Sequence, residues 1–202
     1  MTVGKGTGWG RPGSLPVGAA IVDSDAALRR IVEDARRREV TIGPVGLTGG
    51  SLWWAVGGPS VTGRLHTDAA MHFPIDVVRV QADGHAHWFV GALVARTRLW
   101  GHALVAMNGQ FLAGRRVGVR AHPGDGLVDV YEAVLSMGDV AKVARRARLG
   151  AHLPHPGIRE RRVGSWDASF ASRRTLWLDG ERVARIRTLR LTVEPDAVIV
   201  VV

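Results

Sequence analysis

The chain has 202 residues, of which 46% are hydrophobic and 22% are charged, a balance typical of a globular domain with a core. It has no cysteine, which excludes disulfides, thiolate metal sites and a cysteine nucleophile. Its net charge of +9 favours anionic partners such as nucleotides, nucleic acid or anionic lipid, although a general bias toward Arg explains the charge equally well. No apolar run approaches the roughly 20 residues of a membrane span, so we expect a cytoplasmic protein, with peripheral attachment to a membrane as the alternative.

Residues 1–16 are rich in Gly and Pro and predict a loop. The glycines within residues 4–8 have the composition of a phosphate-binding loop. Such a loop needs a strand before it and a helix after it, so that backbone amides converge on the anion. Neither is predicted here, and a terminal segment without a site is the better interpretation.

The next part of the chain alternates between strand and helix patterns. Residues 17–22 form an apolar run that predicts a short buried strand. Residues 26–38 carry apolar side chains at helical spacing, after a segment rich in N-cap residues. A second apolar run at residues 40–47 is followed by a glycine turn and a short predicted helix over residues 51–56. This order is typical of an α/β segment.

From about residue 61 the pattern changes to short apolar runs, which predict a β-sandwich or a curled antiparallel sheet. Asp83-Gly84 is a hairpin signal, and residues 137–149 predict a basic helix. The predicted strands are residues 73–82, 87–95, 102–108, 115–120, 128–135, 158–163, 168–170, 175–178, 182–186, 189–193 and 198–202. We therefore predict an α+β fold, with a reduced α/β segment over residues 1–60 and a larger antiparallel β-sandwich-like domain over residues 61–202.

Few motifs in the chain carry chemistry by themselves. The eight histidines show no ligand spacing on a predicted helix, so hydrogen bonding or exposure explains them better than a metal. The serines lack the surroundings of a hydrolase nucleophile. The adjacent Trp53 and Trp54 predict either a core position or an interface with a second copy or another protein.

Two acidic side chains stand close together in the second half of the chain. Asp179 and Glu181 are separated by Gly180, and on an extended strand this spacing puts both carboxylates on one face. Such a pair can share a proton or hold a cation, so that one member acts as a base. A plain hairpin turn with exposed acids explains the same pattern, and by pattern alone it is the stronger interpretation.

Residues 102–202 resemble the bacterial diacylglycerol kinases and sphingosine-type lipid kinases. The matching pieces occur in the family's order, and they are Asn108-Gly109, Asp125-Gly126-Leu127, Asp179-Gly180-Glu181 and Glu194-Pro195. The upstream half matches more loosely, because residues 45–51 stand where the family has a glycine-rich nucleotide loop. A second glycine-rich loop of the family would fall near residues 22–26, where the glycines are absent.

The resemblance implies a set of site residues. The nucleotide would lie against Thr48, Gly49, Gly50, Ser51 and Asp25, with an eroded loop around them. Asp179 would take the proton of a lipid hydroxyl, with Glu181 assisting, while ATP provides the phosphoryl group and magnesium offsets its charge. A structural magnesium would be bound by Asp125 and by the carbonyl oxygens of His122 and Leu127.

Three hypotheses of function follow. The first is a divergent member of the lipid kinases that transfers the ATP γ-phosphate to a lipid hydroxyl. The second is a non-catalytic pseudokinase that binds a lipid, a nucleotide or a protein partner. The third, a nucleic-acid-binding protein, rests on net charge alone and is the least supported. The expected partners are therefore a lipid or an anionic membrane surface, and a second copy or another protein.

Overall fold

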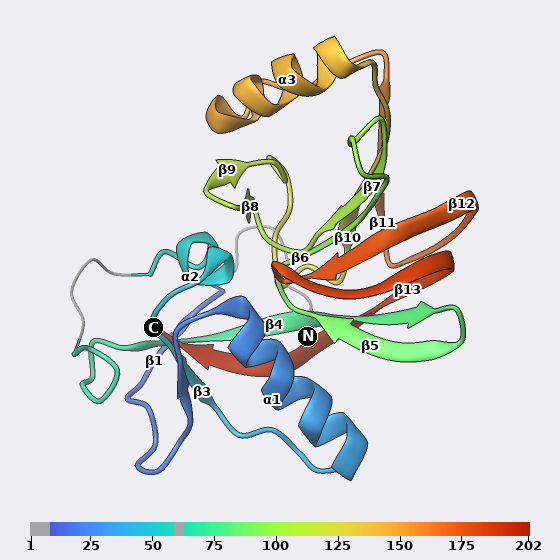
Figure 1. The fold of residues 1–202 in the computed structure, drawn as a ribbon. Coiled ribbons are helices and arrows are strands. Elements are labelled where there is room, and N and C mark those ends of the chain that lie inside the picture. Colours follow the sequence, from blue (N-terminus) through green and yellow to red (C-terminus); the bar gives the residue numbers. More distant parts are fainter. Residues whose placement is uncertain (1–8, 59–62) are drawn as a thin grey trace.

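The computed structural model describes residues 9–58 and 63–202 (Figure 1). Residues 1–8 of the loop predicted at residues 1–16, and the boundary predicted at residue 60, lie outside the described residues. The described part of that loop contains one two-residue strand, β1 (Arg11–Pro12), which the sequence did not predict. Three α-helices are present in the described part: α1 (Asp25–Arg38), α2 (Ser51–Ala55) and α3 (Met137–Arg146), the last extended by a 3-10 turn, η1 (Ala147–Leu149). None of them has the length and apolar character needed to cross a bilayer.

The strands form one 11-stranded sheet and a separate two-stranded hairpin. The hairpin consists of β8 (Phe111–Leu112) and β9 (Arg115–Arg116). The strands of the large sheet are β1 (Arg11–Pro12), β2 (Ile21–Val22), β3 (Val45–Leu47), β4 (Met71–Ala82), β5 (His85–Phe89), β6 (Ala92–Arg96), β7 (His102–Met107), β10 (Val128–Val134), β11 (Ile158–Val163), β12 (Ser165–Leu178) and β13 (Glu181–Val201). Along its main path the order is β1-β4-β13-β12-β6-β7-β10-β11, with β5 paired to β4.

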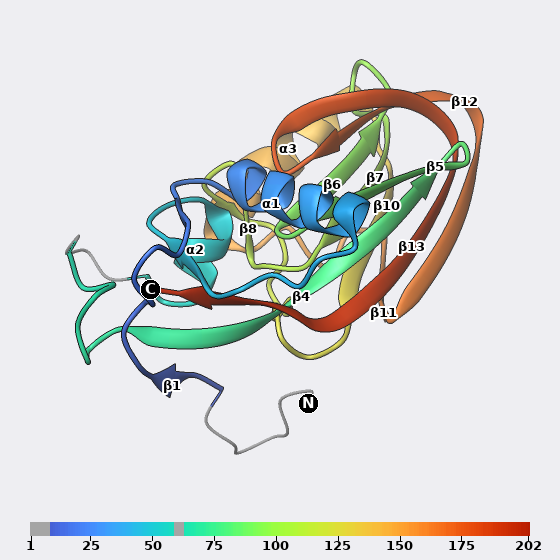
Figure 2. The same cartoon turned by 90° about the horizontal axis from the view of Figure 1, so that it is seen from below.

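The predicted α+β fold class is confirmed, and the sheet curls as a sandwich does (Figure 2). Inside the curl, the main core packs β4 and β13 against β6, β7, β10 and β12. Side chains alternate between the two faces of a strand, so Val78, Val80 and Ala82 of β4 enter this core together.

Helix α1 begins and ends where its sequence predicts. The Ser24 hydroxyl accepts a hydrogen bond from the Ala27 amide at 3.3 Å, and Glu39 ends the helix in the left-handed region at φ 55°. Leu28 and Val32 are wholly buried in a second core, which α1 shares with β3, β4 and β13. The apolar stripe of the helix therefore covers one face of the sheet.

The last part of the chain differs from its prediction. Five short strands were expected over residues 168–202, and the structure has two long ones, β12 and β13. The Pro195-Asp196 pair indicates a break, but it lies in a bulge between Glu194 and Val198, where Asp196 takes a φ of 52°. A bulge tolerates a proline and a positive φ without ending the pairing on either side.

The amino-terminal segment belongs to the same sheet as the rest of the chain. Strands β2 and β3 pair in parallel, and β3 pairs in parallel with β13 through Val45 and Val200. The α/β segment and the curled sheet are thus joined by backbone hydrogen bonds.

We expect the L28A variant to lower the free energy of unfolding by about 2–5 kcal/mol, because it leaves a cavity under α1. Urea denaturation followed by circular dichroism measures this loss. The control R38A, on a side chain that is 70% exposed, should change stability by less than about 0.5 kcal/mol. Equal effects of the two variants would contradict the packing described for α1.

Candidate functional site

Asp179 lies at the tip of the β12–β13 hairpin, in the left-handed region at φ 48°. Its carboxylate accepts hydrogen bonds from three consecutive amides of the β5–β6 connection: Val90 at 3.1 Å, Gly91 at 2.8 Å and Ala92 at 3.0 Å. The side chain is wholly buried. The sequence pattern favoured a hairpin turn with exposed acids, whereas the carboxylate of Asp179 is turned inward and binds the neighbouring backbone.

Asp25 performs a similar task in the amino-terminal segment. Its carboxylate accepts hydrogen bonds from the amides of Ser51, at 2.9 Å, and Leu52, at 3.0 Å, at the start of α2. Of the predicted nucleotide residues, Gly50 and Ser51 meet Asp25. Thr48 instead donates to the Val22 carbonyl at 3.2 Å, and Gly49 lies against the Asp23 carbonyl. The two amides that would face a phosphate there already bind a carboxylate, so a nucleotide would have to displace Asp25 or bind elsewhere.

Gly50 and Gly91 leave no room for a side chain, because the carboxylates of Asp25 and Asp179 lie against their backbone. A Cβ on Gly50, whose φ is 97°, would lie 2.4 Å from Oδ1 of Asp25. A Cβ on Gly91 would lie 2.9 Å from Oδ2 of Asp25 and 3.3 Å from Oδ1 of Asp179. Both carboxylates therefore approach the same backbone point, and a larger residue would collide with them.

Burial favours the protonated form of both carboxyl groups. Burial raises the pKa of Asp179 to about 7, the charge of Asp25 adds to the shift, and the three amides oppose it. Burial likewise raises the pKa of Asp25, against the hydrogen bonds from Leu52 and Ser51. A carboxyl group with a pKa near 7 can accept and release a proton near neutral pH.

Arg29 is a member of the site that the sequence analysis missed. Its side chain, 7% exposed, binds Glu33 at 3.0 Å and Glu181 at 2.5 Å, and its Nε lies 3.8 Å from Asp179 Oδ2. Arg30 also pairs with Glu181. The signal for Arg29 was its place next to Leu28 on the buried side of α1, one turn after Asp25. Glu181 is thus tied to α1 by two guanidinium groups.

The predicted magnesium turn is held together by protein groups. Asp125 accepts the Leu127 amide at 3.0 Å and forms an ion pair with Arg162, and the His122 ring accepts the Gly124 amide at 3.3 Å. Residues 9–58 and 63–202 contain no group of three or more His, Cys, Asp and Glu side chains that could hold a metal ion. A magnesium ion at Asp125 would compete with the guanidinium of Arg162, and the site stays a prediction.

Asp76 on β4 anchors this turn, and the sequence analysis missed it. It is fully buried and accepts the Gly126 amide at 2.6 Å and the Asp196 amide at 3.0 Å. Burial raises its pKa to about 6. Asn108 links this region to the carboxylate pair, because its Nδ2 donates to the carbonyls of Asp76 and Val90, each at 2.8 Å.

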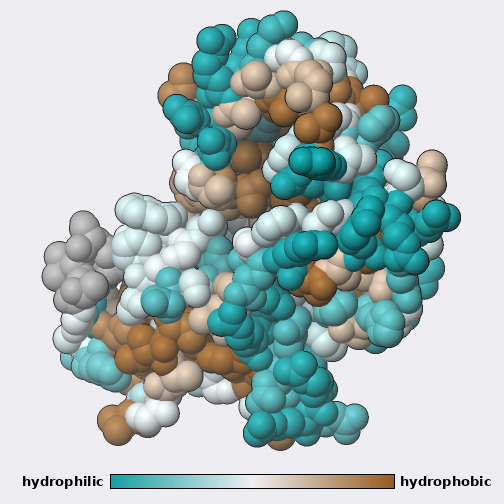
Figure 3. All heavy atoms as spheres, in the orientation of Figure 1, coloured by the Kyte–Doolittle hydropathy of each residue, from teal (hydrophilic) through white to brown (hydrophobic). Residues whose placement is uncertain are grey.

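A pocket of about 480 Å³ opens on the outer face of the sheet. Its floor is formed by side chains of β6, β7, β10 and β12, and α3 covers it with Val140, Val143 and Ala144. Gly180, next to Asp179, lies at its edge. Hydrophobic side chains gather in the hollow beneath α3 (Figure 3). Sequence periodicity indicated buried strands here, but not that a helix would bridge the sheet and leave a space below it.

The raised pKa of Asp179 predicts a pH dependence of stability. The pKa of an unfolded Asp is about 3.9 and that of folded Asp179 is about 7, so the stability that this group contributes is lost as pH rises through that window. The D179N variant lacks this titration. We therefore expect the free energy of unfolding of the wild type, relative to D179N, to fall from about pH 4 to about pH 7 in urea denaturation and to level off above that range.

The matched control is D167N, which changes an exposed carboxylate on β12, the strand that leads to Asp179. Its stability relative to the wild type should show a much smaller change over this range. A wild-type advantage over D179N that stays flat or grows with pH would contradict the raised pKa.

Comparison with known proteins identifies the fold of the chain through solved structures. No family model and no curated protein matches the sequence. Among solved structures, a diacylglycerol kinase from Bacillus anthracis str. Sterne matches 89% of this chain and 74% of its own, with a TM-score of 0.63 and 10% identity. Two further structures from this organism, provisionally named as diacylglycerol kinases, match 89% of this chain and 76% of theirs, with TM-scores of 0.65 and 0.64 at 10% and 11% identity. The chain therefore has the fold of the bacterial diacylglycerol kinases.

Proposed function

We propose that the protein binds a single-chain lipid in the pocket beneath α3, with the polar end of the lipid at Gly180. The observation that carries this proposal is the apolar pocket of about 480 Å³. Its size lies within the range of pockets for small ligands, and its apolar walls favour an alkyl chain because burying that chain removes it from water.

The polar end of the bound lipid would lie near the carboxylate pair. Gly180 and Ala92 line the pocket, and the Ala92 amide donates to Asp179. Arg96 and Trp100 line the pocket toward the other end of β6, with the guanidinium 4.6 Å from the centre of the indole ring. A polar head group at Gly180 would lie near backbone groups, and Arg96 is four residues further along the strand from Ala92.

Phosphoryl transfer to the hydroxyl of the bound lipid is the second candidate function. The observation that favours it is the pKa of about 7 at Asp179, one residue from the pocket edge. Asp179 would accept the hydroxyl proton, and Glu181 would act through Arg29, which contacts both carboxylates. ATP with magnesium would supply the phosphoryl group. Asp25 occupies the amides of Ser51 and Leu52, so a nucleotide at these amides would first have to displace it.

Lipid binding is tested by filling the pocket. Ala103 is buried and lines the floor, so the A103F variant should occupy the space of the chain and weaken binding of monolaurin at least tenfold. Isothermal titration calorimetry on the full chain measures the affinity. The control V134F adds the same ring at a position on β10 that is 64% exposed and should bind as the wild type does. Absence of binding to the wild type would overturn the proposed function.

Phosphoryl transfer is tested by lipid-dependent consumption of ATP with magnesium. The D179N variant should lose about 100-fold or more of the turnover, the range expected for a general base. Circular dichroism and monolaurin binding report whether it folds, and D167N is the exposed control. Background turnover in both wild type and D179N, with lipid binding intact, would leave the protein a lipid-binding member of the fold without transferase activity.

A further inference from the structure

The floor of the pocket contains one row of side chains that crosses four strands. Trp177 on β12 lies opposite Val94 on β6. Val94 lies opposite Val105 on β7, and Val105 lies opposite Tyr131 on β10. All four residues line the pocket. Neighbouring strands are about 4.8 Å apart, so the row spans roughly 14 Å, and a lipid chain that follows it runs from β12 to β10.

Strand β13 borders the pocket on the β12 side and adds two arginines to the pocket face of the sheet. Arg182 lies directly opposite Trp177, and Arg185 lies opposite Thr175. Residues that are paired across two antiparallel strands project their side chains to the same face, so both arginines lie on the face that carries the pocket. Both are exposed. Beyond Trp177, the row of the floor therefore continues to a guanidinium group.

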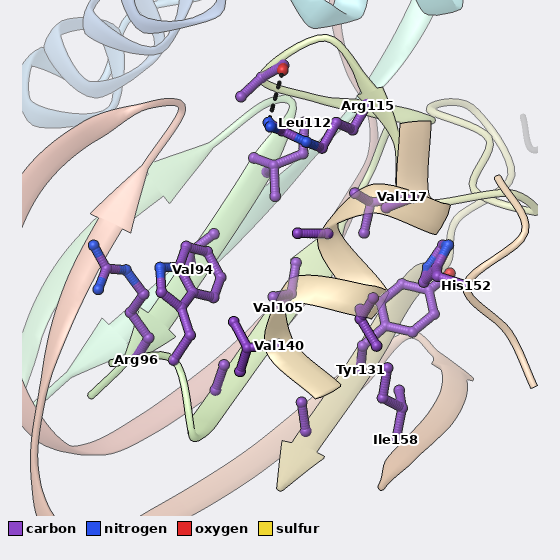
Figure 4. A pocket seen from close by; sticks show the side chains of 18 of the residues that line it. Val94, Arg96, Val105, Leu112, Arg115, Val117, Tyr131, Val140, His152 and Ile158 are labelled. Carbon is purple, nitrogen blue, oxygen red and sulfur yellow. Dashed lines mark hydrogen bonds between the residues drawn. The ribbon is translucent and has the colours of Figure 1, made fainter. Parts of the chain in front are cut away.

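A third arginine, Arg96, lies at the same end of the pocket. It is paired with Thr175 from the β6 side, so Arg96 and Arg185 flank one residue of β12. Its guanidinium carbon lies 5.9 Å from the centre of the Trp177 ring. Figure 4 shows Arg96 at the end of the pocket that lies away from Tyr131. The apolar row thus has positive charge at its β12 end.

The arginine group, which consists of Arg96, Arg182 and Arg185, has no acidic partner. Within residues 9–58 and 63–202, none of its members forms an ion pair with a carboxylate. Glu181, the neighbour of Arg182 in the sequence, pairs with two arginines of α1. The Arg96 guanidinium donates to two backbone carbonyls of the loop after β6, which leaves its charge in place. Three positive charges within two strand spacings repel one another, and a bound anion would relieve this repulsion.

We propose that the natural ligand of the pocket is a single-chain lipid with a phosphate head group, and that the arginine group binds this phosphate. The inference rests on the proposed lipid binding and adds the class of lipid. The chain follows the row of the floor, and the head group lies over Thr175 and Trp177, between Arg96 and the two arginines of β13. A guanidinium group donates two parallel hydrogen bonds to phosphate oxygens. A phosphate carries enough oxygens and charge to be shared by more than one guanidinium group.

The test compares two lipids with the same chain, monolaurin and its phosphate ester, lauroyl lysophosphatidate. Isothermal titration calorimetry on the full wild-type chain, with both lipids below the concentration at which they form micelles, should find that the phosphate ester binds about tenfold more tightly. This gain is that of a hydrogen bond to a charged group, about 1.5 kcal/mol.

Two further measurements separate a lipid from a free phosphate compound. Glycerol phosphate has the head group without the chain and should bind far more weakly than lauroyl lysophosphatidate. The A103F variant, which fills the floor of the pocket, should weaken lauroyl lysophosphatidate as it weakens monolaurin. If glycerol phosphate binds as tightly as the lipid, or if A103F leaves lauroyl lysophosphatidate unaffected, the phosphate is bound without the pocket and the inference is overturned.

The arginines are tested with the double variant R182Q/R185Q, in which the preference for the phosphate ester should fall from about tenfold toward one, with circular dichroism as the check on folding. The matched control is R37Q/R79Q, which removes the same charge at exposed positions of α1 and β4 that do not line the pocket. It should keep the preference. Equal losses in the two double variants would assign the preference to net charge and overturn the inference.

The affinities of the wild type separate this inference from the proposed function. If monolaurin binds and lauroyl lysophosphatidate binds no more tightly, the inference is overturned and the proposed lipid binding stands. If neither lipid binds, the proposed function fails together with the inference.

Discussion

The structure depends on one buried carboxyl group that is held by backbone amides. Asp179 closes the hairpin between the two longest strands, and its carboxylate collects three successive amides from the β5–β6 connection. Through Arg29 and the facing Asp25, the same point also fixes α1 and the start of α2. Removing this carboxyl group from water costs free energy, and the hydrogen bonds from the three amides compensate part of that cost. Elements distant in sequence are thereby brought to one place, at the edge of the pocket.

Local patterns in the sequence predicted the helices and most strands. Helix α1 has a capping serine, an apolar stripe and a stop signal, so its limits are readable. The sequence could not show that the five predicted strands form only two, β12 and β13. Without a known partner strand, Pro195 and Asp196 indicate the end of a strand. A bulge is stabilised by its neighbours, here by Asp76, which binds the Asp196 amide from β4. Such an interaction over 120 positions leaves no local signal.

The candidate site was also only partly predictable, because local motifs mark its residues but not their long-range contacts. Family resemblance singled out Asp179, Glu181, Asp25 and the turn around Asp125. Asp179 and Glu181 do meet at Arg29, and Asp25 meets Asp179 at Gly91. What sequence reasoning could not supply was the direction of each carboxylate. Asp25 and Asp179 face amides, and Asp125 faces Arg162. The pocket was also beyond reach, because its space arises only from the distance at which α3 crosses the sheet.

Strand β13 limits how the two halves of the molecule can move relative to each other. Its 21 residues pair with β12 and β4, and near its end with β3 of the amino-terminal segment. Two halves joined by a flexible linker can swing apart as rigid bodies, but halves joined by one continuous strand cannot. Any opening between them has to bend β13, and the bulge between Glu194 and Val198 is where its ladder is already interrupted. The continuous strand therefore restricts the two halves to small bending motions, centred on this bulge.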